Sequence, residues 1–379
     1  MSMIKIESRF LMISKGKKVL HILGALNVGG AETMVMNVYK NIDFNKVKFD
    51  FIVNGPDVGY YEKEIDLINS KIYHITKRSE SWVKHLKDIY FIIKNEKYVT
   101  IHYHTENSFL AFIDLFVCKL AGASNLIVHS HNTMDYRGGK VAKLSKYFKK
   151  PLYYLANKRL SCGDAAAIWL YGTTNNVHII PLPVDCKKYM YSVEKQKNLK
   201  MRLGIKCSKI YTHVGSLSRV KNQLFVLDIF NEIHKIDNKA MLLLIGKGDY
   251  EDKIRNKISK LNLENSVFMP GVINDVYDKL IMSDGFIFPS LFEGFPTVML
   301  EAQAAGLPCY ASDTITKRIA ITDNVYFRSL DDSAKEWAEF IVNNNDYSEN
   351  SRLKANKEIA KEYDIKKVVK DFYNVYEVD

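Results

Sequence analysis

The 379-residue sequence lacks the features that mark membrane-spanning, secreted and disulfide-bonded proteins. It has no run of about 18 uncharged apolar residues, so no transmembrane helix is expected. The N-terminal stretch MSMIKIESRFLMISKGKK contains no apolar core long enough for a signal peptide. The 5 cysteines are scattered and include no Cys-x-x-Cys pair, which argues against a disulfide framework and a zinc site. We therefore expect a cytoplasmic protein.

Internal repeats and low-complexity tracts are also absent, and two blocks of alternating strand-like and helix-like patterns are present instead. The β-rich runs lie at 18–23, 49–53, 71–75, 100–103 and 126–129 in the first block, and at 209–214, 241–245, 267–269, 285–288 and 307–310 in the second. Apolar residues at helical spacing predict an amphipathic helix over 82–97. Near-continuous apolar strands between helices are typical of parallel sheets covered on both faces. The sequence predicts an α/β fold of two Rossmann-like lobes with a central cleft.

The best candidate for a linker between the lobes is Pro181-Leu182-Pro183, followed by a Lys-rich polar stretch over 195–200. This boundary gives an N-terminal domain of residues 1–183 and a C-terminal domain of residues 184–379. The pattern near the C-terminus is helical. This last helix, about 365–379, is a candidate to pack back on the N-terminal domain.

The strongest functional signal is the start of a helix after a buried strand of the second block. Pro296 suits the first position of that helix, because its missing N–H would be unpaired there anyway. The free amides of Thr297, Val298 and Met299 would then point out of the helix start. Together with the helix dipole they would form an anion site suited to a diphosphate.

Two glutamates flank this helix start. Glu293 lies in the preceding loop with Gly294, and Glu301 follows eight residues later in the second turn. One carboxylate could hold sugar hydroxyls and the other could hold ribose hydroxyls. A capped, solvated helix with two unrelated glutamates is the alternative for either residue alone.

Two further signals follow first-block strands, at the edge where ligands bind in open parallel sheets. Gly29 and Gly30 stand directly after the first strand, and adjacent glycines allow a backbone to approach a ligand closely. The segment His129-Ser130-His131-Asn132 ends another strand. A plain tight turn and a structural histidine are the alternatives.

The loop Gly215–Asn222 follows the first strand of the second block. Arg219 and Lys221 could reach phosphate oxygens from this loop. Two surface cations before a helix are the alternative.

Taken together, these strings resemble the retaining family-4 glycosyltransferases of the GT-B fold, and more closely their bacterial capsular and exopolysaccharide branch. The matching strings are GGAE at 29–32, HSHN at 129–132, CGDAAAIWLYG at 162–172, VKNQ at 220–223 and FPSLFEGFPTVMLEAQAAGLPCYASDTIT at 288–316. They span most of the chain, and the last is highly specific.

The resemblance implies transfer of a hexose from a nucleotide-sugar, expected to be a UDP-sugar, with retention at the anomeric carbon and with no essential metal or cofactor. It implies a donor site in the C-terminal domain and acceptor binding in the N-terminal domain. Glu293 and Glu301 would be the family's paired glutamates, Lys221 a pyrophosphate ligand and His131 the cleft histidine. The catalytic candidates are Glu293 and His131. The donor-binding candidates are Gly30, Arg219, Lys221, Gly294, Phe295, Pro296, Thr297, Val298 and Glu301, and the acceptor or cleft candidates are Gly29 and Asn132.

Two positions depart from the family pattern. An arginine usually follows the glycine at 215, and here the residue is Ser216; Arg219 is the candidate to supply that charge. Relatives also tend to have glutamate where Arg318 stands. The first departure keeps a catalytically silent binding subunit of the same fold open, and a nucleotide-sugar epimerase is a further alternative.

The formal net charge of +11 is partly concentrated between residues 137 and 159, where no Asp or Glu occurs. The basic residues of this segment are Arg137, Lys140, Lys143, Lys146, Lys149, Lys150, Lys158 and Arg159. Interleaved aromatic and leucine residues favour an amphipathic element at an anionic membrane surface. A solvated basic helix over an apolar core is the alternative, and no recognised motif supports nucleic-acid binding. We therefore expect peripheral association with the inner face of the cell membrane and a lipid-linked or glycan acceptor.

Overall fold

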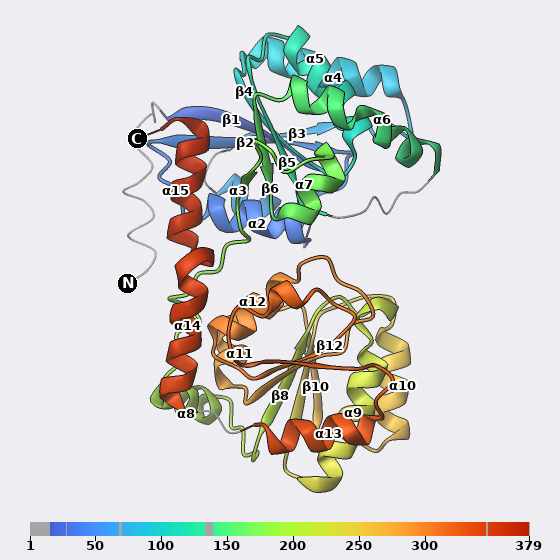
Figure 1. Cartoon of the computed structure of the whole chain (residues 1–379), viewed down its shortest axis with the longest axis vertical. Helices are drawn as coiled ribbons and strands as arrows, with labels where there is room; N and C mark the ends of the chain where they lie inside the picture. The colour runs from blue at the N-terminus through green and yellow to red at the C-terminus, as the bar shows by residue number, and fades with distance from the viewer. Residues whose placement is uncertain (1–15, 28, 68–69, 133–138, 346–347, 379) are drawn as a thin grey trace. The chain divides into compact units, whose positions relative to one another are not determined.

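The computed structural model describes residues 16–27, 29–67, 70–132, 139–345 and 348–378. The chain divides into two compact units. Met1–Pro183 together with Ile365–Asp379 form the first unit, and Val184–Asp364 form the second. Each unit is a parallel sheet covered by helices (Figure 1). The predicted α/β class with two Rossmann-like units is confirmed.

The sheet of the first unit has the strand order β3-β2-β1-β4-β5-β6-β7, with parallel pairings. Its strands are β1 (Lys17–Ile22), β2 (Val47–Asn54), β3 (Ile72–Ile75), β4 (Thr100–Thr105), β5 (Asn125–Ser130), β6 (Lys158–Ser161) and β7 (His178–Ile179). Its helices are α2 (Gly30–Tyr39), α3 (Glu62–Asp66), α4 (Trp82–Glu96), α5 (Ser108–Leu120), α6 (Gly139–Leu155), α7 (Asp164–Tyr171) and α15 (Ile365–Tyr376).

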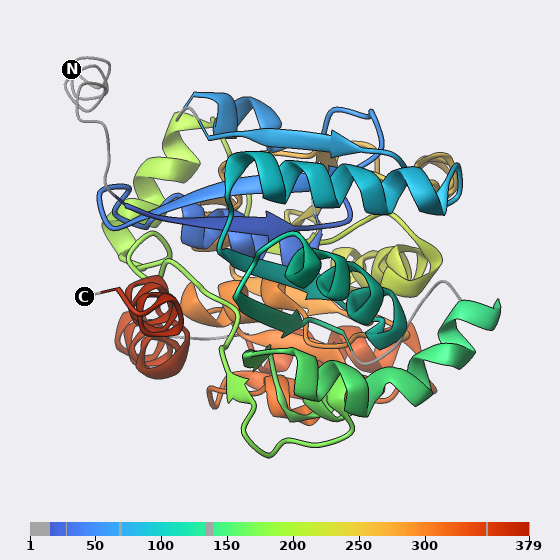
Figure 2. The ribbon, with the colours of Figure 1, turned by 90° about the horizontal axis from the view of Figure 1, so that it is seen from above.

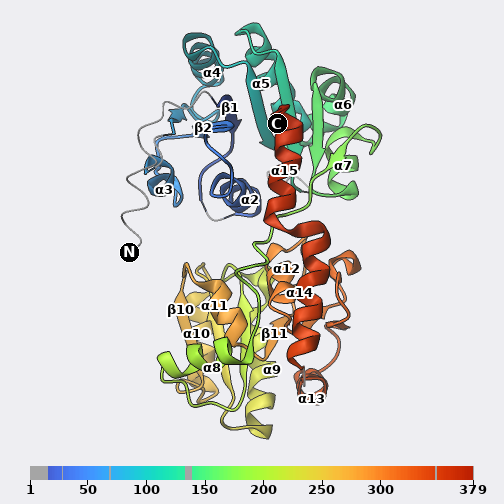
Figure 3. The same ribbon diagram turned by 90° about the vertical axis from the view of Figure 1, so that its left-hand side faces the viewer.

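The two faces of this first sheet differ in chemistry. One face is mainly aliphatic, with some tyrosines, and packs against α4, α5 and α6; Figure 2 shows α4 and α5 side by side. The other face presents histidine and phenylalanine rings. It is covered by Tyr39 of α2 and by Phe372 and Tyr376 of α15, and Figure 3 shows α15 running alongside this unit. Alternate residues of a strand point to opposite faces, so the pattern His102-x-His104 places both rings on the second face.

The sheet of the second unit has the order β10-β9-β8-β11-β12-β13, again with parallel pairings. Its strands are β8 (Ile210–Val214), β9 (Met241–Ile245), β10 (Val267–Gly271), β11 (Gly285–Phe288), β12 (Cys309–Ser312) and β13 (Val325–Arg328). Its helices are α8 (Val193–Arg202), η1 (Arg219–Lys221), α9 (Gln223–Ile236), α10 (Glu251–Lys260), α11 (Val276–Met282), α12 (Thr297–Ala304), η2 (Lys317–Ile319), α13 (Ala334–Asn343) and α14 (Glu349–Tyr363).

Strand order reverses once in each sheet, between β1 and β4 in the first and between β8 and β11 in the second. Connections on the two sides of such a reversal cover opposite faces, which leaves a crevice at the carboxyl ends of the two strands. The reversal between β8 and β11 therefore places the loop after Val214 beside the loop after Phe288.

Every predicted strand is observed, including the edge strands β3 and β10, whereas the strands β6, β7 and β13 were not predicted. The helix predicted over 82–97 is observed as Trp82–Glu96. The prediction that the polar stretch over 195–200 belongs to a linker is wrong, because this stretch lies within α8 of the second unit. The amphipathic element predicted over 137–159 is shorter than expected: α6 ends at Leu155, and Lys158 begins β6. None of the described helices combines the length and apolar character needed to cross a bilayer.

Gly306 provides a test of how α12 is held against α14. It follows α12 with φ of +71°, and an added Cβ would lie 2.4 Å from the Cα atom of Arg352 on α14. We predict that Gly306→Ala lowers the free energy of unfolding by more than the roughly 1–3 kcal/mol that backbone strain costs alone, because two backbones must also separate. The matched control is Gly122→Ala, with φ of +112° and no atom within 4 Å of the added Cβ. Equal losses for both variants in urea denaturation would contradict this prediction.

Candidate active site

The second unit brings Lys221 and Glu293 together at the reversal between β8 and β11. The Lys221 Nζ atom lies 2.6 Å from Glu293 Oε1, and both side chains are mostly buried. The stem of Lys221 passes over Gly215, and its ammonium group lies 5.2 Å from the ring centroid of Phe288. A lysine and a carboxylate that were predicted as separate ligands therefore form an ion pair.

Hydrogen bonds between the loop after β8 and the loop after β11 hold this pair in place. The Leu291 amide donates to the Val220 carbonyl at 2.8 Å. The Asn222 side-chain amide donates to the Pro289 carbonyl at 3.0 Å. The two loops thus behave as one framework for Lys221.

Gln223 organises the start of the same framework and was not singled out from the sequence. Its buried side chain donates to the Ser216 carbonyl at 2.8 Å and accepts from the Ser218 amide at 3.3 Å. Gly246 supports the loop from the next strand: with φ of +142°, an added Cβ would lie 1.9 Å from the Gly215 carbonyl oxygen. The sequence signal for this contact is the string Gly246-Lys247-Gly248 directly after β9.

The helix start differs in detail from the prediction. Pro296 lies just before α12 as its N-cap, with an extended ψ of 110°, and the helix begins at Thr297. The Met299 amide was predicted to be free but donates to the Pro296 carbonyl at 3.0 Å. This bond tightens the first turn and leaves the amides of Thr297 and Val298 as the candidate anion ligands.

Of the residues between Glu293 and α12, Gly294 and Phe295 are partly buried and Pro296 is buried. The ring of Phe295 lies parallel to that of Tyr363 at the end of α14, with an interplanar angle of 13°. Gly294 separates this packed ring from the glutamate. Phe295 therefore anchors the loop to α14.

Glu301 on α12 lies beside Tyr189, a residue that sequence reasoning did not identify. The pKa of Glu301 is raised to about 7, because the effect of burial, which raises it, is larger than that of the hydrogen bond from the Tyr189 hydroxyl, which lowers it. The same burial raises the pKa of the Tyr189 hydroxyl well above its ordinary value. No spacing rule could have paired them, because Tyr189 lies far upstream of α12 in the sequence.

Arg219 and Ser216 are both exposed. Arg219 opens η1, the short turn that carries Lys221, and the Ser216 hydroxyl lies 3.5 Å from that of Ser218. Arg219 therefore shares a short turn with Lys221, and its side chain lies at the surface.

The first-unit candidates lie at the carboxyl edge of their own sheet. Gly29 is the N-cap of α2, and an added Cβ would meet the Glu32 carboxylate at 2.4 Å. Gly30 begins α2 and faces open space. His131 and Asn132 follow β5 and are partly exposed.

His131 is bound to a neighbouring histidine. Its Nε2 atom lies 2.8 Å from Nδ1 of His104 on β4. Burial lowers the pKa of His131 to about 3, so the imidazole is neutral near neutral pH. A neutral ring can donate one hydrogen bond and accept one but cannot supply a positive charge.

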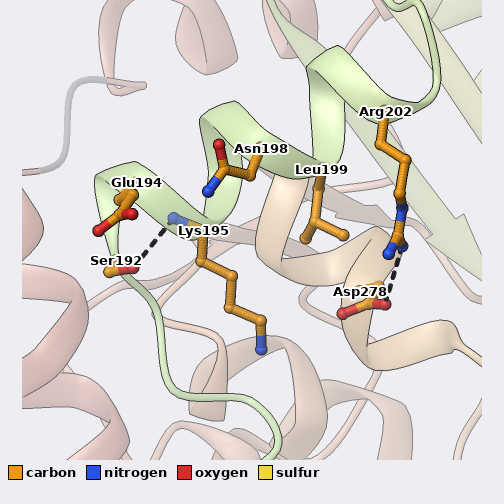
Figure 4. A pocket seen from close by; sticks show the side chains of 7 residues that line it. All are labelled: Ser192, Glu194, Lys195, Asn198, Leu199, Arg202 and Asp278. Atoms are coloured by element: carbon orange, nitrogen blue, oxygen red, sulfur yellow. Dashed lines mark hydrogen bonds and ion pairs between the residues drawn. The ribbon is translucent and has the colours of Figure 1, made fainter.

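A surface pocket of about 430 Å³ lies elsewhere in the second unit (Figure 4). Its lining residues are Ser192, Glu194, Lys195, Asn198, Leu199, Arg202 and Asp278. Helix α8, which carries most of them, contacts Met282 and Asp284 just before β11, so this pocket is at the amino edge of the sheet. Ligands of such folds bind at the carboxyl edge, where Lys221 and Glu293 lie.

Comparison with known proteins identifies the family of this chain. Residues 195–361 match the family model described as glycosyl transferases group 1. The chain is 32% identical over 343 residues to EpsF of Bacillus subtilis (strain 168), which is named as a glycosyltransferase, and the match covers 87% of this chain and 88% of EpsF. This chain belongs to the glycosyltransferases.

Two further similarities cover most of this glycosyltransferase. An Escherichia coli protein named UDP-Gal:alpha-D-GlcNAc-diphosphoundecaprenol alpha-1,3-galactosyltransferase is 26% identical, over 78% of this chain and 79% of its own. The crystal structure of HepE from Anabaena in complex with UDP and glucose has a TM-score of 0.74 at 17% identity, covering 95% of this chain and 99% of HepE. The predicted GT-B fold is confirmed.

The raised pKa of Glu301 predicts a pH-dependent stability. With a pKa of about 7 when folded and 4.5 as its ordinary value, the folded chain holds this proton more tightly than the unfolded chain. The contribution to stability is complete below the ordinary pKa and is lost as pH rises through the folded pKa. Glu301→Gln should therefore flatten part of the fall in Tm between about pH 5 and pH 8. The control is Glu339→Gln, an exposed residue; parallel profiles for wild type and Glu301→Gln would refute the prediction.

Proposed function

We propose that this glycosyltransferase moves a hexose from a UDP-sugar to a lipid-linked or glycan acceptor in cell-surface polysaccharide assembly, with retention at the anomeric carbon. The observation that carries the proposal is the ion pair of Lys221 and Glu293 beside the start of α12. A cation, a carboxylate and unpaired helix amides at one sheet edge provide separate ligands for a diphosphate and for sugar hydroxyls.

The comparisons support the donor and acceptor classes. HepE, whose fold this chain shares, was crystallised with UDP and glucose. The Escherichia coli relative is named for a UDP-sugar donor and a diphosphoundecaprenol-linked acceptor. The shared fold and sequence similarity make the same classes the first choice here.

In the proposed mechanism, the donor diphosphate accepts hydrogen bonds from the Thr297 and Val298 amides and from Lys221. Lys221 gives up its ion pair with Glu293 to make this bond. The freed Glu293 carboxylate then accepts hydrogen bonds from hydroxyls of the transferred sugar. Glu301, in its ionised form, accepts hydrogen bonds from the ribose. The leaving phosphate helps to deprotonate the acceptor in a front-face displacement that uses no metal or cofactor.

The first unit would receive the acceptor at its carboxyl edge. Gly29 and Gly30 let the backbone approach the ligand, and Asn132 adds a side-chain amide. With no metal bound, the neutral His131 orients a hydroxyl by a single hydrogen bond. Arg219 is proposed to supply the charge that Ser216 lacks, since its exposed side chain is adjacent to the Lys221 turn.

The roles of the two glutamates can be separated by ligand binding. We predict that Glu301→Ala weakens UDP binding at least about tenfold, because a lost hydrogen bond to a charged group costs roughly 1.5–3 kcal/mol. Glu293→Ala should retain UDP binding and lose turnover, because Glu293 contacts the transferred sugar. Calorimetry with UDP and an assay of donor hydrolysis measure the two effects, and equal losses of UDP affinity would show that the division of roles is wrong.

The same hydrolysis assay distinguishes the proposed function from its alternatives. A transferase releases free sugar and UDP, an epimerase produces an isomeric UDP-sugar, and a silent binding subunit produces neither. UDP-, GDP- and ADP-sugars in a thermal-shift screen identify the donor base, since a ligand at 100 times its Kd adds about 2.7 kcal/mol of stability.

We also propose that α6 associates with the inner face of the membrane. Lys143, Lys146, Tyr147, Lys150 and Tyr154 are exposed, and their spacing of three and four residues places them on one helical face. Tyr147 and Tyr154 are 66% and 73% exposed. Basic and aromatic side chains on one exposed face are typical of an anionic lipid interface.

The opposite face of α6 is packed. Phe148 contacts the rings of Phe109 and Phe112 on α5, with centroids 4.8 and 5.2 Å apart. Leu152 is buried. The aromatic residues of this segment therefore divide into a core set and an exposed set.

We predict that reversing Lys143, Lys146 and Lys150 to Glu releases the protein from anionic vesicles. Each cation near such a surface contributes about 1 kcal/mol, and the attraction fades over roughly 8 Å at physiological ionic strength. Donor hydrolysis should be unchanged. The control reverses three exposed lysines of the second unit, Lys239, Lys253 and Lys260, which changes the net charge equally.

The exposed aromatic residues contribute the salt-resistant part of this binding. Tyr147→Ala should lower flotation at high salt with an unchanged Tm, whereas Phe148→Ala should lower Tm. Equal flotation of both charge-reversal variants would argue against a lipid surface on α6.

A further inference from the structure

Three histidines at the carboxyl ends of β4 and β5 form a compact group in the first unit. Strand register pairs His104 directly with His129, and His131 lies two residues beyond His129. The ring centroids are 4.2 to 5.6 Å apart. Each residue offers one ring nitrogen, and these three atoms lie within 4.8 Å of one another.

Several nitrogens of this group are buried without a hydrogen-bond partner in the part of the chain that the structure describes. His129 is fully buried, and neither its Nδ1 nor its Nε2 atom has such a partner. The Nδ1 atom of His131 is likewise buried without a hydrogen-bond partner among the described residues. A neutral imidazole always carries one N–H donor and one lone pair, and burying both unsatisfied is unfavourable. These unpaired nitrogens point to a bound species that accepts lone pairs.

We propose that His104, His129 and His131 bind a divalent transition-metal ion, with Zn²⁺ as the reference case. Neutral imidazoles are preferred ligands of Zn²⁺, Cu²⁺, Ni²⁺ and Co²⁺. Zn–N bonds of about 2.0–2.1 Å place the ligand atoms of a tetrahedral site about 3.3 Å apart. The three nitrogens lie within 4.8 Å of one another and would have to move closer to reach that spacing. The fourth position would take water or an anion, because the three ligands are uncharged.

A second layer of hydrogen bonds orients the proposed ligands. His104 Nε2 lies 3.0 Å from His21 Nδ1, and in the tautomer where His104 donates this bond its Nδ1 lone pair faces His131. His21 Nε2 in turn lies 3.4 Å from the Tyr376 hydroxyl of α15. Partners of this kind fix the tautomer of a metal-binding histidine. Burial lowers the pKa values of all three proposed ligands, so they are in the unprotonated form that coordinates metals.

A second histidine group, His21, His102 and His104, is a weaker candidate. His102 Nδ1 is bonded to the Tyr376 hydroxyl at 2.7 Å, and His21 is bonded to His104. Binding there would disrupt the bonds of His21 and of His102, whereas binding at the first group would disrupt, among the described residues, only the bond between His104 and His131. Access also favours the first group, because His131 is partly exposed at the end of β5.

The test is titration of the full chain, freed of metal by a chelator, with Zn²⁺ and with Co²⁺. We expect one equivalent of Co²⁺ to bind with the visible absorption of a tetrahedral ion, and Zn²⁺ to displace it and raise Tm. His129→Phe keeps an aromatic ring in the stack and removes both unpaired nitrogens. It should weaken binding about 100-fold or more, with a Tm in the absence of metal no lower than that of the wild type.

The control is His178→Phe, which removes an exposed histidine of β7 and should leave binding unchanged. If His129→Phe does not fold, His131→Gln at the partly exposed end of β5 provides the same comparison. Absence of stoichiometric binding by the wild type, or equal binding by wild type and the variant, would overturn the proposal. Loss of binding in His102→Phe together with full binding in His129→Phe would overturn it in favour of the other group. The readout is metal binding, so it is independent of whether the sugar transfer proposed above is correct.

Discussion

The loops after β8 and β11 depend on one another for their shape, and the candidate donor site depends on both. Strand order in the second sheet reverses between these two strands, so their carboxyl ends are neighbours although more than seventy residues separate them in sequence. The bonds from Leu291 to Val220 and from Asn222 to Pro289 join the loops. Lys221 and Glu293 meet only because this framework holds them.

The Lys221–Glu293 pair also constrains how a donor can bind. Both groups are largely removed from water, so each is stabilised by the other against its desolvation cost. A diphosphate can replace the carboxylate as the partner of Lys221, and sugar hydroxyls can replace the lysine as the partner of Glu293. In the proposed mechanism, donor binding is an exchange of partners in which neither charge is left buried and unpaired.

The two faces of the first sheet differ: one supplies the hydrophobic core, and the other carries hydrogen-bonded histidines. The face toward α4, α5 and α6 is mainly aliphatic and supplies the hydrophobic core. The face toward α15 carries histidine rings that bond to one another and to Tyr376. Burying such a polar face costs free energy unless its nitrogens have hydrogen-bond partners. Among the described residues, the nitrogens of His129 have none.

The sequence by itself determined the fold class and most of the strands of both sheets. Continuous apolar runs and turn residues are local signals, so the α/β class and helix Trp82–Glu96 could be predicted from them. Strand β6 and helix α8 could not, because their cations give no clear pattern. Only the tertiary structure decided that Lys221 pairs with Glu293, that Tyr189 adjoins Glu301 and that three histidines gather on one face. These contacts join residues distant in sequence, and their geometry follows from strand order and packing, which no local spacing encodes.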